Sequence, residues 1–182
     1  MRTVMLLAAL ALQDGEGLKV GDAAPAFESV DDAGKPWKSA DHVGKKIVVL
    51  YFYPASFTGG CTKQACAFRD DQKALEEKGV EVVGVSGDAV KTQELFKKEH
   101  NLNFALLADE KGEVAKAFGV ATKAGGKAKV KAGGQDAEFT RGVTASRWTF
   151  IIGKDGKIAY KNTKVNAAED SKAVLEALGK LK

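Results

Sequence analysis

The chain is poor in the residues that build disulfide and metal frameworks, with two cysteines and two histidines among 182 residues. Two cysteines are too few for a small domain held together by disulfides. A cysteine-rich zinc site is also excluded, because His42 and His100 lie far from the cysteines in the sequence. The composition therefore predicts neither a disulfide scaffold nor a metal centre.

Long apolar runs and a strong excess of one charge are missing as well. No apolar stretch reaches the roughly 18 residues of a membrane-spanning helix, so we expect no membrane insertion. The net charge of +4 is too mild to indicate nucleic-acid binding. With 45% hydrophobic and 29% charged residues, the composition is typical of a globular protein, and we place a single domain over residues 18–182.

The first residues have the features of a secretory signal peptide. Arg2 precedes an apolar stretch over residues 4–12, and Ala9 and Ala11 have the small side chains and spacing that a signal peptidase reads. We expect a signal peptide over residues 1–12 and a periplasmic or secreted protein. The alternative is a cytoplasmic protein in which this stretch is an unstructured extension or a short helix packed on the domain.

Strands and helices are predicted to alternate along most of the chain. Residues 46–53 (KIVVLYFY) form a continuous β-branched and aromatic run, which is typical of a strand buried on both faces. Turn-rich residues predict one hairpin over 27–39, and Asp155-Gly156 predicts another between strands 148–152 and 157–160. The remaining predicted elements are strands 80–86 and 104–107 and helices 61–78, 88–100 (with Asp88 as N-cap), 110–118 and 167–181. This order predicts an α/β fold with a central, mainly parallel sheet, an antiparallel edge hairpin and flanking helices.

One segment interrupts this pattern. Residues 121–146 are rich in Gly, Ala and Lys and contain few large apolar side chains. Such a segment buries little surface, so we expect a long mobile loop or a weak hairpin. Its lysines suggest either a solvated insertion or a docking patch for an acidic partner.

The residues with the clearest chemical role follow the first buried strand. Cys61 lies in the first turn of a predicted helix, at the edge of the sheet where α/β proteins usually bind ligands. Free backbone N–H groups and the helix dipole favour a negative charge there, so the position should favour a nucleophilic thiolate. Gly59 and Gly60 let the backbone approach a small substrate closely. The Thr58 hydroxyl is suited to capping the helix or to hydrogen bonding beside the sulfur.

Cys66 follows five residues after Cys61. On one regular helix their Cα atoms would be roughly 8–9 Å apart. A disulfide needs about 4.4–6.8 Å. If the two residues bond, the first helical turn must therefore unwind, which suits a redox cycle better than a permanent disulfide. Two unrelated cysteines and a static disulfide remain as alternatives.

The residues around these cysteines resemble the peroxiredoxin family. Pro54-x-x-x-Thr58-x-x-Cys61 matches its P-x-x-x-T-x-x-C signature, and the wider pattern resembles the Q-type subgroup, also called bacterioferritin comigratory protein. This similarity covers most of residues 20–160 and includes Phe52-Tyr53-Pro54, Cys61-Thr62, Ala65-Cys66, Phe68-Arg69-Asp70, Val83-Gly84-Val85-Ser86, residues 103–109 (NFALLAD) and residues 147–152 (RWTFII).

The resemblance implies a thioredoxin-like fold and a thiol peroxidase that reduces hydrogen peroxide and small organic hydroperoxides. By position, Cys61 is the peroxidatic cysteine and Cys66 the resolving cysteine. The roles carried over for the other residues are peroxide binding and thiolate stabilisation by Thr58 and Arg147, and shielding of a pocket by Pro54, beside Gly60. The family needs no cofactor, is recycled by a thioredoxin-like reductant, and is often monomeric when the cysteines are spaced in this way.

Two departures from the family pattern concern the site. Gly59 replaces a proline that many relatives carry, which should loosen the loop before Cys61. The segment 121–146 looks longer than in relatives and precedes Arg147, so the position of that arginine depends on how the segment folds. Two other functions remain open: a protein-disulfide oxidoreductase, which normally has C-x-x-C, and a thioredoxin-fold module that binds copper, for which His100 is the only histidine after the cysteines.

Overall fold

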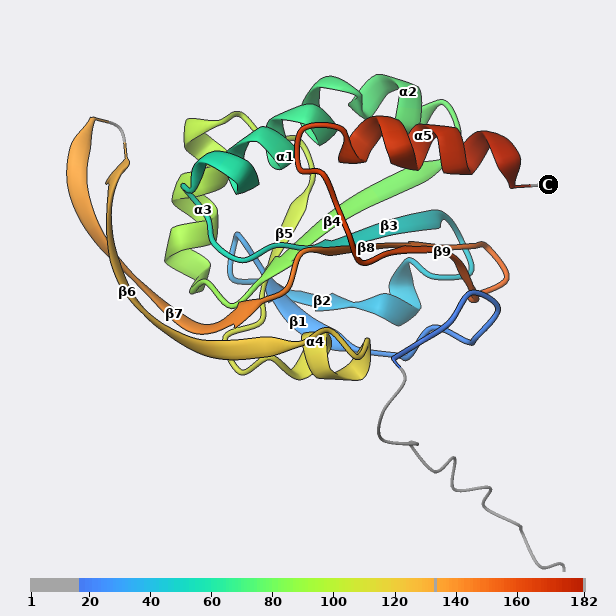
Figure 1. Ribbon diagram of the computed structural model, residues 1–182, viewed down its shortest axis with the longest axis horizontal. Coiled ribbons are helices and arrows are strands. Elements are labelled where there is room, and N and C mark those ends of the chain that lie inside the picture. Colours follow the sequence, from blue (N-terminus) through green and yellow to red (C-terminus); the bar gives the residue numbers. More distant parts are fainter. Residues whose placement is uncertain (1–16, 133, 182) are drawn as a thin grey trace, which may run out of the picture.

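A seven-stranded mixed sheet forms the centre of the protein (Figure 1). The computed structural model describes residues 17–132 and 134–181, so the predicted signal peptide lies outside the described residues. The strands of the central sheet are β1 (Glu28–Asp31), β2 (Pro36–Lys38), β3 (Ile47–Phe52), β4 (Val80–Ser86), β5 (Ala105–Ala108), β8 (Trp148–Ile152) and β9 (Ile158–Asn162).

The strands follow the order β2-β1-β5-β4-β3-β8-β9. The three central strands, β5, β4 and β3, are parallel. An antiparallel hairpin closes each edge, β1–β2 on one side and β8–β9 on the other. The prediction of a parallel core with antiparallel edge pairing is therefore confirmed.

Helices cover both faces of the sheet, and β3 supplies side chains to each. Val48, Leu50 and Phe52 face one core, whereas Val49 and Tyr51 face the other. Because both faces are covered, a continuous apolar run replaces the alternation of a half-exposed strand. The second core lies under α1 (Gly59–Asp70), α2 (Gln72–Glu76), α3 (Val90–Glu99) and α5 (Asp170–Lys180), and α4 (Glu113–Ala117) covers the first; a short 3-10 helix, Ser39–Asp41, follows β2.

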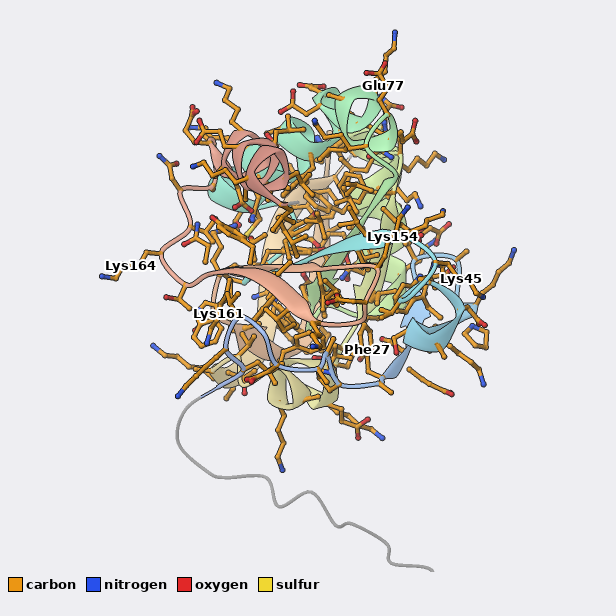
Figure 2. All side chains as sticks on the ribbon, turned by 90° about the vertical axis from the view of Figure 1, so that its right-hand side faces the viewer. Phe27, Lys45, Glu77, Lys154, Lys161 and Lys164 are labelled. Atoms are coloured by element: carbon orange, nitrogen blue, oxygen red, sulfur yellow. The ribbon has the colours of Figure 1, made fainter. Side chains whose placement is uncertain are left out.

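Most charged side chains lie on the outside of this arrangement, with buried exceptions that include Asp88 and Asp170. In Figure 2, Glu77 and Lys164 are at the outer surface, while apolar side chains fill the space between helices and sheet. None of the helices in residues 17–132 and 134–181 is long and apolar enough to cross a membrane.

Two helix predictions were wrong in detail. The helix predicted over residues 61–78 is divided into α1 and α2, because the backbone at Asp71 (φ −89°, ψ 4°) leaves the helical conformation. Asp88 does not cap α3, since the N-cap is Ala89 and no side chain caps it. Asp88 is instead fully buried and bonded to other parts of the fold, which sequence periodicity does not reveal.

The segment predicted as a loop or weak hairpin is a long hairpin. Its strands, β6 (Thr122–Ala132) and β7 (Gln135–Ala145), pair with each other as a separate two-stranded sheet, and an isolated bridge joins Arg141 of β7 to Asp88. Figure 1 shows this hairpin, which we call the arm, curving away from the central sheet. The small residues predicted to bury little surface still support two 11-residue strands, because cross-strand hydrogen bonds need no large side chains.

Candidate active site

The site begins where β3 ends. Residues 54–58, which we call the site loop, connect β3 to α1, and Tyr53 N at the start of this turn donates to Val85 O at 3.0 Å. Thr58 is the N-cap residue of α1, but its hydroxyl donates to Ala55 O at 2.9 Å and caps no helical N–H. The capping prediction for that hydroxyl is therefore wrong. Its lone pairs stay available to accept a hydrogen bond from a substrate.

Cys61 is the third residue of α1, as the sequence predicts for a residue in the first helical turn. Its side chain is 1% exposed and belongs to the apolar cluster that includes Tyr51 and Phe68. A charge in such surroundings needs a partner, because burial removes the stabilisation that water provides.

Arg147 provides that partner. Its Nη2 lies 3.2 Å from Cys61 Sγ, although the two residues are 86 positions apart in the sequence. Arg147 lies in the short connection between β7 and β8. The length of the arm therefore does not displace Arg147 from the site. A Cβ on Gly60 would lie 3.3 Å from Arg147 Nη2, so the absence of a side chain at Gly60 gives the guanidinium room.

Three residues that sequence reasoning missed hold Arg147 in place. Gln64 Oε1 accepts a hydrogen bond from Arg147 Nη1, and Gln64 Nε2 donates to Asp170 Oδ2 at 2.7 Å. Thr149 Oγ1 donates to the same carboxylate oxygen at 2.7 Å. Gln64 lies three residues after Cys61, so helical spacing could have placed it beside the sulfur. No sequence signal links it to Asp170, 106 residues away.

Burial changes the pKa of titratable groups in and around this hydrogen-bond network. Desolvation raises the pKa of Asp170, and hydrogen bonds from Thr149 and Gln64 and the charge of Arg147 oppose it. Desolvation also raises the pKa of Tyr51 well above its usual range, and the charges of Tyr53 and Cys61 raise it further. Tyr51 therefore stays protonated at neutral pH and does not act as a base.

Cys66 is on the same helix but is not brought to Cys61. Cys66 is half-buried, whereas Cys61 is buried, and both are free cysteines. Five helical residues correspond to about 8–9 Å between Cα atoms and a rotation of about 140°. A neighbouring guanidinium, that of Arg69, has a raised pKa; a hydrogen bond to Asp70 is the main cause, burial opposes it, and Cys66 contributes further.

The other residues predicted for the site occupy its edges. Pro54 is half-buried at the start of the site loop, whereas Gly59 is exposed and a Cβ there would meet nothing within 4 Å. Residues 17–132 and 134–181 contain no group of three His, Cys, Asp or Glu side chains able to hold a metal ion. His100 packs against Phe57 and Phe96, with ring centroids 6.2 and 5.0 Å away.

The site loop contains an unusual backbone conformation. Phe57 has φ +63°, in the left-handed region that bulky residues rarely adopt. This conformation costs about 1–2 kcal/mol. Aromatic rings on both sides compensate, since Phe57 contacts Phe96 with centroids at 5.2 Å and Phe139 of the arm at 5.1 Å.

Comparison with known proteins shows the same family at the level of sequence and fold. The AhpC/TSA family matches residues 20–161. A chloroplastic peroxiredoxin Q from Sedum lineare is 45% identical over 144 residues, which cover 78% of this chain and 68% of the relative. Peroxiredoxin Bcp from Bacillus subtilis is 37% identical over 165 residues, covering 91% of this chain and 96% of the relative.

A solved structure agrees with these matches. Peroxidoxin BcpB from Mycobacterium tuberculosis superposes with a TM-score of 0.75 at 32% identity, covering 91% of this chain and 99% of that one. The matches to the chloroplastic relatives from Sedum lineare and Populus jackii span 68% and 46% of those proteins' lengths. The family match, the identities to curated relatives and the shared fold agree, and the chain is a peroxiredoxin of the AhpC/TSA family, in its Q/Bcp group.

Proposed function

We propose that Cys61 is the peroxidatic cysteine of a thioredoxin-dependent peroxidase and that Cys66 resolves its oxidised form. The observation that carries this proposal is the 3.2 Å contact between Arg147 Nη2 and Cys61 Sγ at the N-terminus of α1. A fixed guanidinium and free helical N–H groups both stabilise a thiolate. The same guanidinium has donors left to orient the oxygens of a peroxide.

The first step is the attack of the Cys61 thiolate on the terminal oxygen of a hydroperoxide. The S–O bond forms as the O–O bond breaks, so the peroxide is reduced by two electrons and leaves as an alkoxide or hydroxide, which takes a proton to give an alcohol or water. Cys61 becomes a sulfenic acid. In this proposal the Thr58 hydroxyl oxygen accepts a hydrogen bond from the peroxide, Gly60 leaves space beside Arg147, and Pro54 shields the site.

The second step joins the two cysteines. The Cys66 thiolate attacks the sulfenic sulfur of Cys61, an S–S bond forms, and hydroxide leaves as water. Because both residues lie on α1, the first turn of that helix must open before their sulfurs can meet. A dithiol reductant of the thioredoxin type then exchanges with the disulfide and restores both thiols.

The substrate class is proposed from the burial of Cys61, and the cellular setting from the predicted signal peptide over residues 1–12. The 1% exposure of Cys61 favours hydrogen peroxide and small organic hydroperoxides. An intramolecular disulfide needs no second chain, so a monomer stays our prediction. Export also stays a prediction, and it would require a thiol relay across the membrane to supply the reductant.

The experiment that tests this function distinguishes the roles of the two cysteines. Peroxide consumption is measured with thioredoxin as the reductant, and the product is followed by intact mass. We expect Cys61→Ser to abolish consumption because no sulfenic acid can form. Cys66→Ser should consume one equivalent of peroxide and then stop.

Each variant is a control for the other, since both remove one thiol from α1. Sustained turnover by Cys61→Ser would remove the assignment of the peroxidatic cysteine. Undiminished cycling by Cys66→Ser would show that another thiol resolves the sulfenic acid. A protein-disulfide oxidoreductase would instead reduce insulin disulfides and leave peroxide unconsumed.

A further inference from the structure

The root of the arm is fixed against the loop that follows β4. Gly142 N of β7 donates to Gly87 O at 2.9 Å. The backbones approach so closely that a Cβ on Gly87 would lie 2.0 Å from Val143 O, and one on Gly142 would lie 1.9 Å from Glu110 O. No side chain fits at either glycine without displacing the backbone. The arm is thus anchored to the central domain at a defined position.

An ion pair beside this anchor connects the arm to the site loop. Arg141 Nε of β7 donates to Asp88 Oδ1 at 2.7 Å, and the two side chains are 15% and 0% exposed. The other carboxylate oxygen, Asp88 Oδ2, accepts hydrogen bonds from Ser56 N at 2.7 Å and from Ser86 Oγ at 2.9 Å. Arg141 therefore compensates a buried charge whose second oxygen holds the backbone of the site loop.

A second contact reaches the next residue of the same loop. Phe139 of β7 stacks on Phe57, with ring centroids 5.1 Å apart and an interplanar angle of 20°. Phe139 is 9% exposed, although it belongs to a hairpin that curves away from the sheet (Figure 1). Phe57 has the left-handed backbone conformation, so this stack supports the loop where its conformation is least favourable.

We propose that Arg141 and Phe139 are positioning residues that hold the site loop in the conformation required for the reaction of Cys61 with peroxide. The inference rests on the proposed function and assigns to the arm a role in it. Ser56 and Phe57 directly precede Thr58 and the first turn of α1, so displacing them displaces Thr58 and the helical N–H groups around Cys61. Peroxide reduction needs this loop in place, whereas formation of the Cys61–Cys66 bond needs it to be released.

The two steps therefore respond differently when the arm contacts are weakened. Arg141→Gln removes the ion pair, and Phe139→Leu removes the aromatic stack while keeping an apolar side chain. In single-turnover stopped-flow experiments, we expect both variants to slow the peroxide step by about threefold or more. The rate at which the sulfenic acid becomes the disulfide should be unchanged or higher.

A matched control and a compensating variant separate positioning from general destabilisation. Lys129→Gln removes one positive charge from an exposed position of the same arm and should leave both steps within about twofold of wild type. Asp88→Asn combined with Arg141→Gln removes both charges and keeps an oxygen that accepts from Ser56 N. We expect this pair to restore the peroxide step relative to Arg141→Gln alone.

Two patterns of rates would overturn this role for the arm. If wild type consumes peroxide but Arg141→Gln and Phe139→Leu match Lys129→Gln, the proposal is overturned while the proposed function stands. Equal slowing of both steps also overturns it, because that pattern reflects general loss of structure. If Arg141→Gln does not fold, as judged by circular dichroism, the pattern in Phe139→Leu decides in the same way.

Discussion

The contact between Cys61 and Arg147 determines what the site can do at the scale of single residues. Cys61 is surrounded by apolar side chains, where an isolated charge is costly. Arg147 lies against its sulfur, and Gln64 fixes the direction of the guanidinium by accepting from its other nitrogen. The planar, forked donor set of arginine allows it to serve the sulfur and Gln64 at once, which the single ammonium of lysine does less well.

Replacing Arg147 should therefore affect the peroxide step more than the fold. We expect Arg147→Lys to lower kcat/KM for hydrogen peroxide by about 10-fold, and Arg147→Gln by about 100-fold or more, because the charge is kept in one variant and lost in the other. Steady-state kinetics at saturating thioredoxin measure both values. Equal activity in wild type and Arg147→Gln would show that the guanidinium does not take part.

Helix α1 combines two opposing requirements at the scale of the element. In the proposed function, its first turn is formed to present N–H groups to Cys61, and it opens to let Cys66 reach that sulfur. Gly59 and Gly60 occupy this turn, and no side chain caps it. Glycine costs about 1 kcal/mol relative to alanine within a helix. The start of α1 is thus less stable than its remaining turns, which pack Ala65 and Phe68 into the core.

Hydrogen–deuterium exchange measured by mass spectrometry should reveal this opening. We expect the amides of residues 59–66 to exchange faster in the oxidised protein than in the reduced protein, because the disulfide is incompatible with a regular helix across both cysteines. The strands β3 and β4 should exchange equally slowly in both forms. Cys66→Ser treated with peroxide is the control, and faster exchange of the same amides in that variant would contradict a link to the disulfide.

At the scale of the whole molecule, buried polar groups join elements that are distant in the sequence. Asp170 at the start of α5 binds Gln64 of α1 and Thr149 of β8. This connects the C-terminal helix to the site through the Gln64–Arg147 contact. Asp88 makes a second such connection, because it binds both the site loop and the arm.

The raised pKa of Asp170 makes the stability of this connection depend on pH. Because the pKa in the folded protein lies above that in the unfolded chain, the folded state binds the proton more tightly. Protonated Asp170 therefore adds to the free energy of unfolding. This contribution is complete below the unfolded-state pKa of about 3.9, and it is lost as the pH rises through the folded-state pKa. Asn does not titrate, so Asp170→Asn should gain stability relative to wild type as the pH increases.

Urea unfolding of both proteins between about pH 4 and pH 7 measures this difference, which amounts to about 1.4 kcal/mol for each unit between the two pKa values. If the substitution also lowers the free energy of unfolding by a constant amount at every pH, the sign of this pH dependence stays the same. Asp136→Asn, at an exposed position of the arm, controls for the loss of one negative charge. If the unfolding free energy of Asp170→Asn minus that of wild type stays flat or falls with increasing pH, the expectation is contradicted.

Local sequence was enough to predict most elements of the fold and the reactive end of the site. The apolar run of β3, the position of Cys61 in the first turn of α1 and the turn at Asp155-Gly156 are short-range patterns, because period, propensity and turn chemistry act over a few residues. The resemblance to a family then indicated Arg147, whose position beside the sulfur the structure shows. The arm remained open between a loop and a hairpin, because its composition contains few local signals.

Only the tertiary structure decided which distant residues meet. Asp88 reads locally as a helix cap, yet its buried carboxylate binds Arg141, 53 residues away, and Ser56 of the site loop. Gln64 and Asp170 form a similar contact across 106 residues. Such pairs leave no periodic trace in a single sequence, because their partners are chosen by the packing of elements. The sequence by itself therefore predicted Cys61 as the nucleophile and determined most of the elements around it, and the packing of those elements decided what holds them in place.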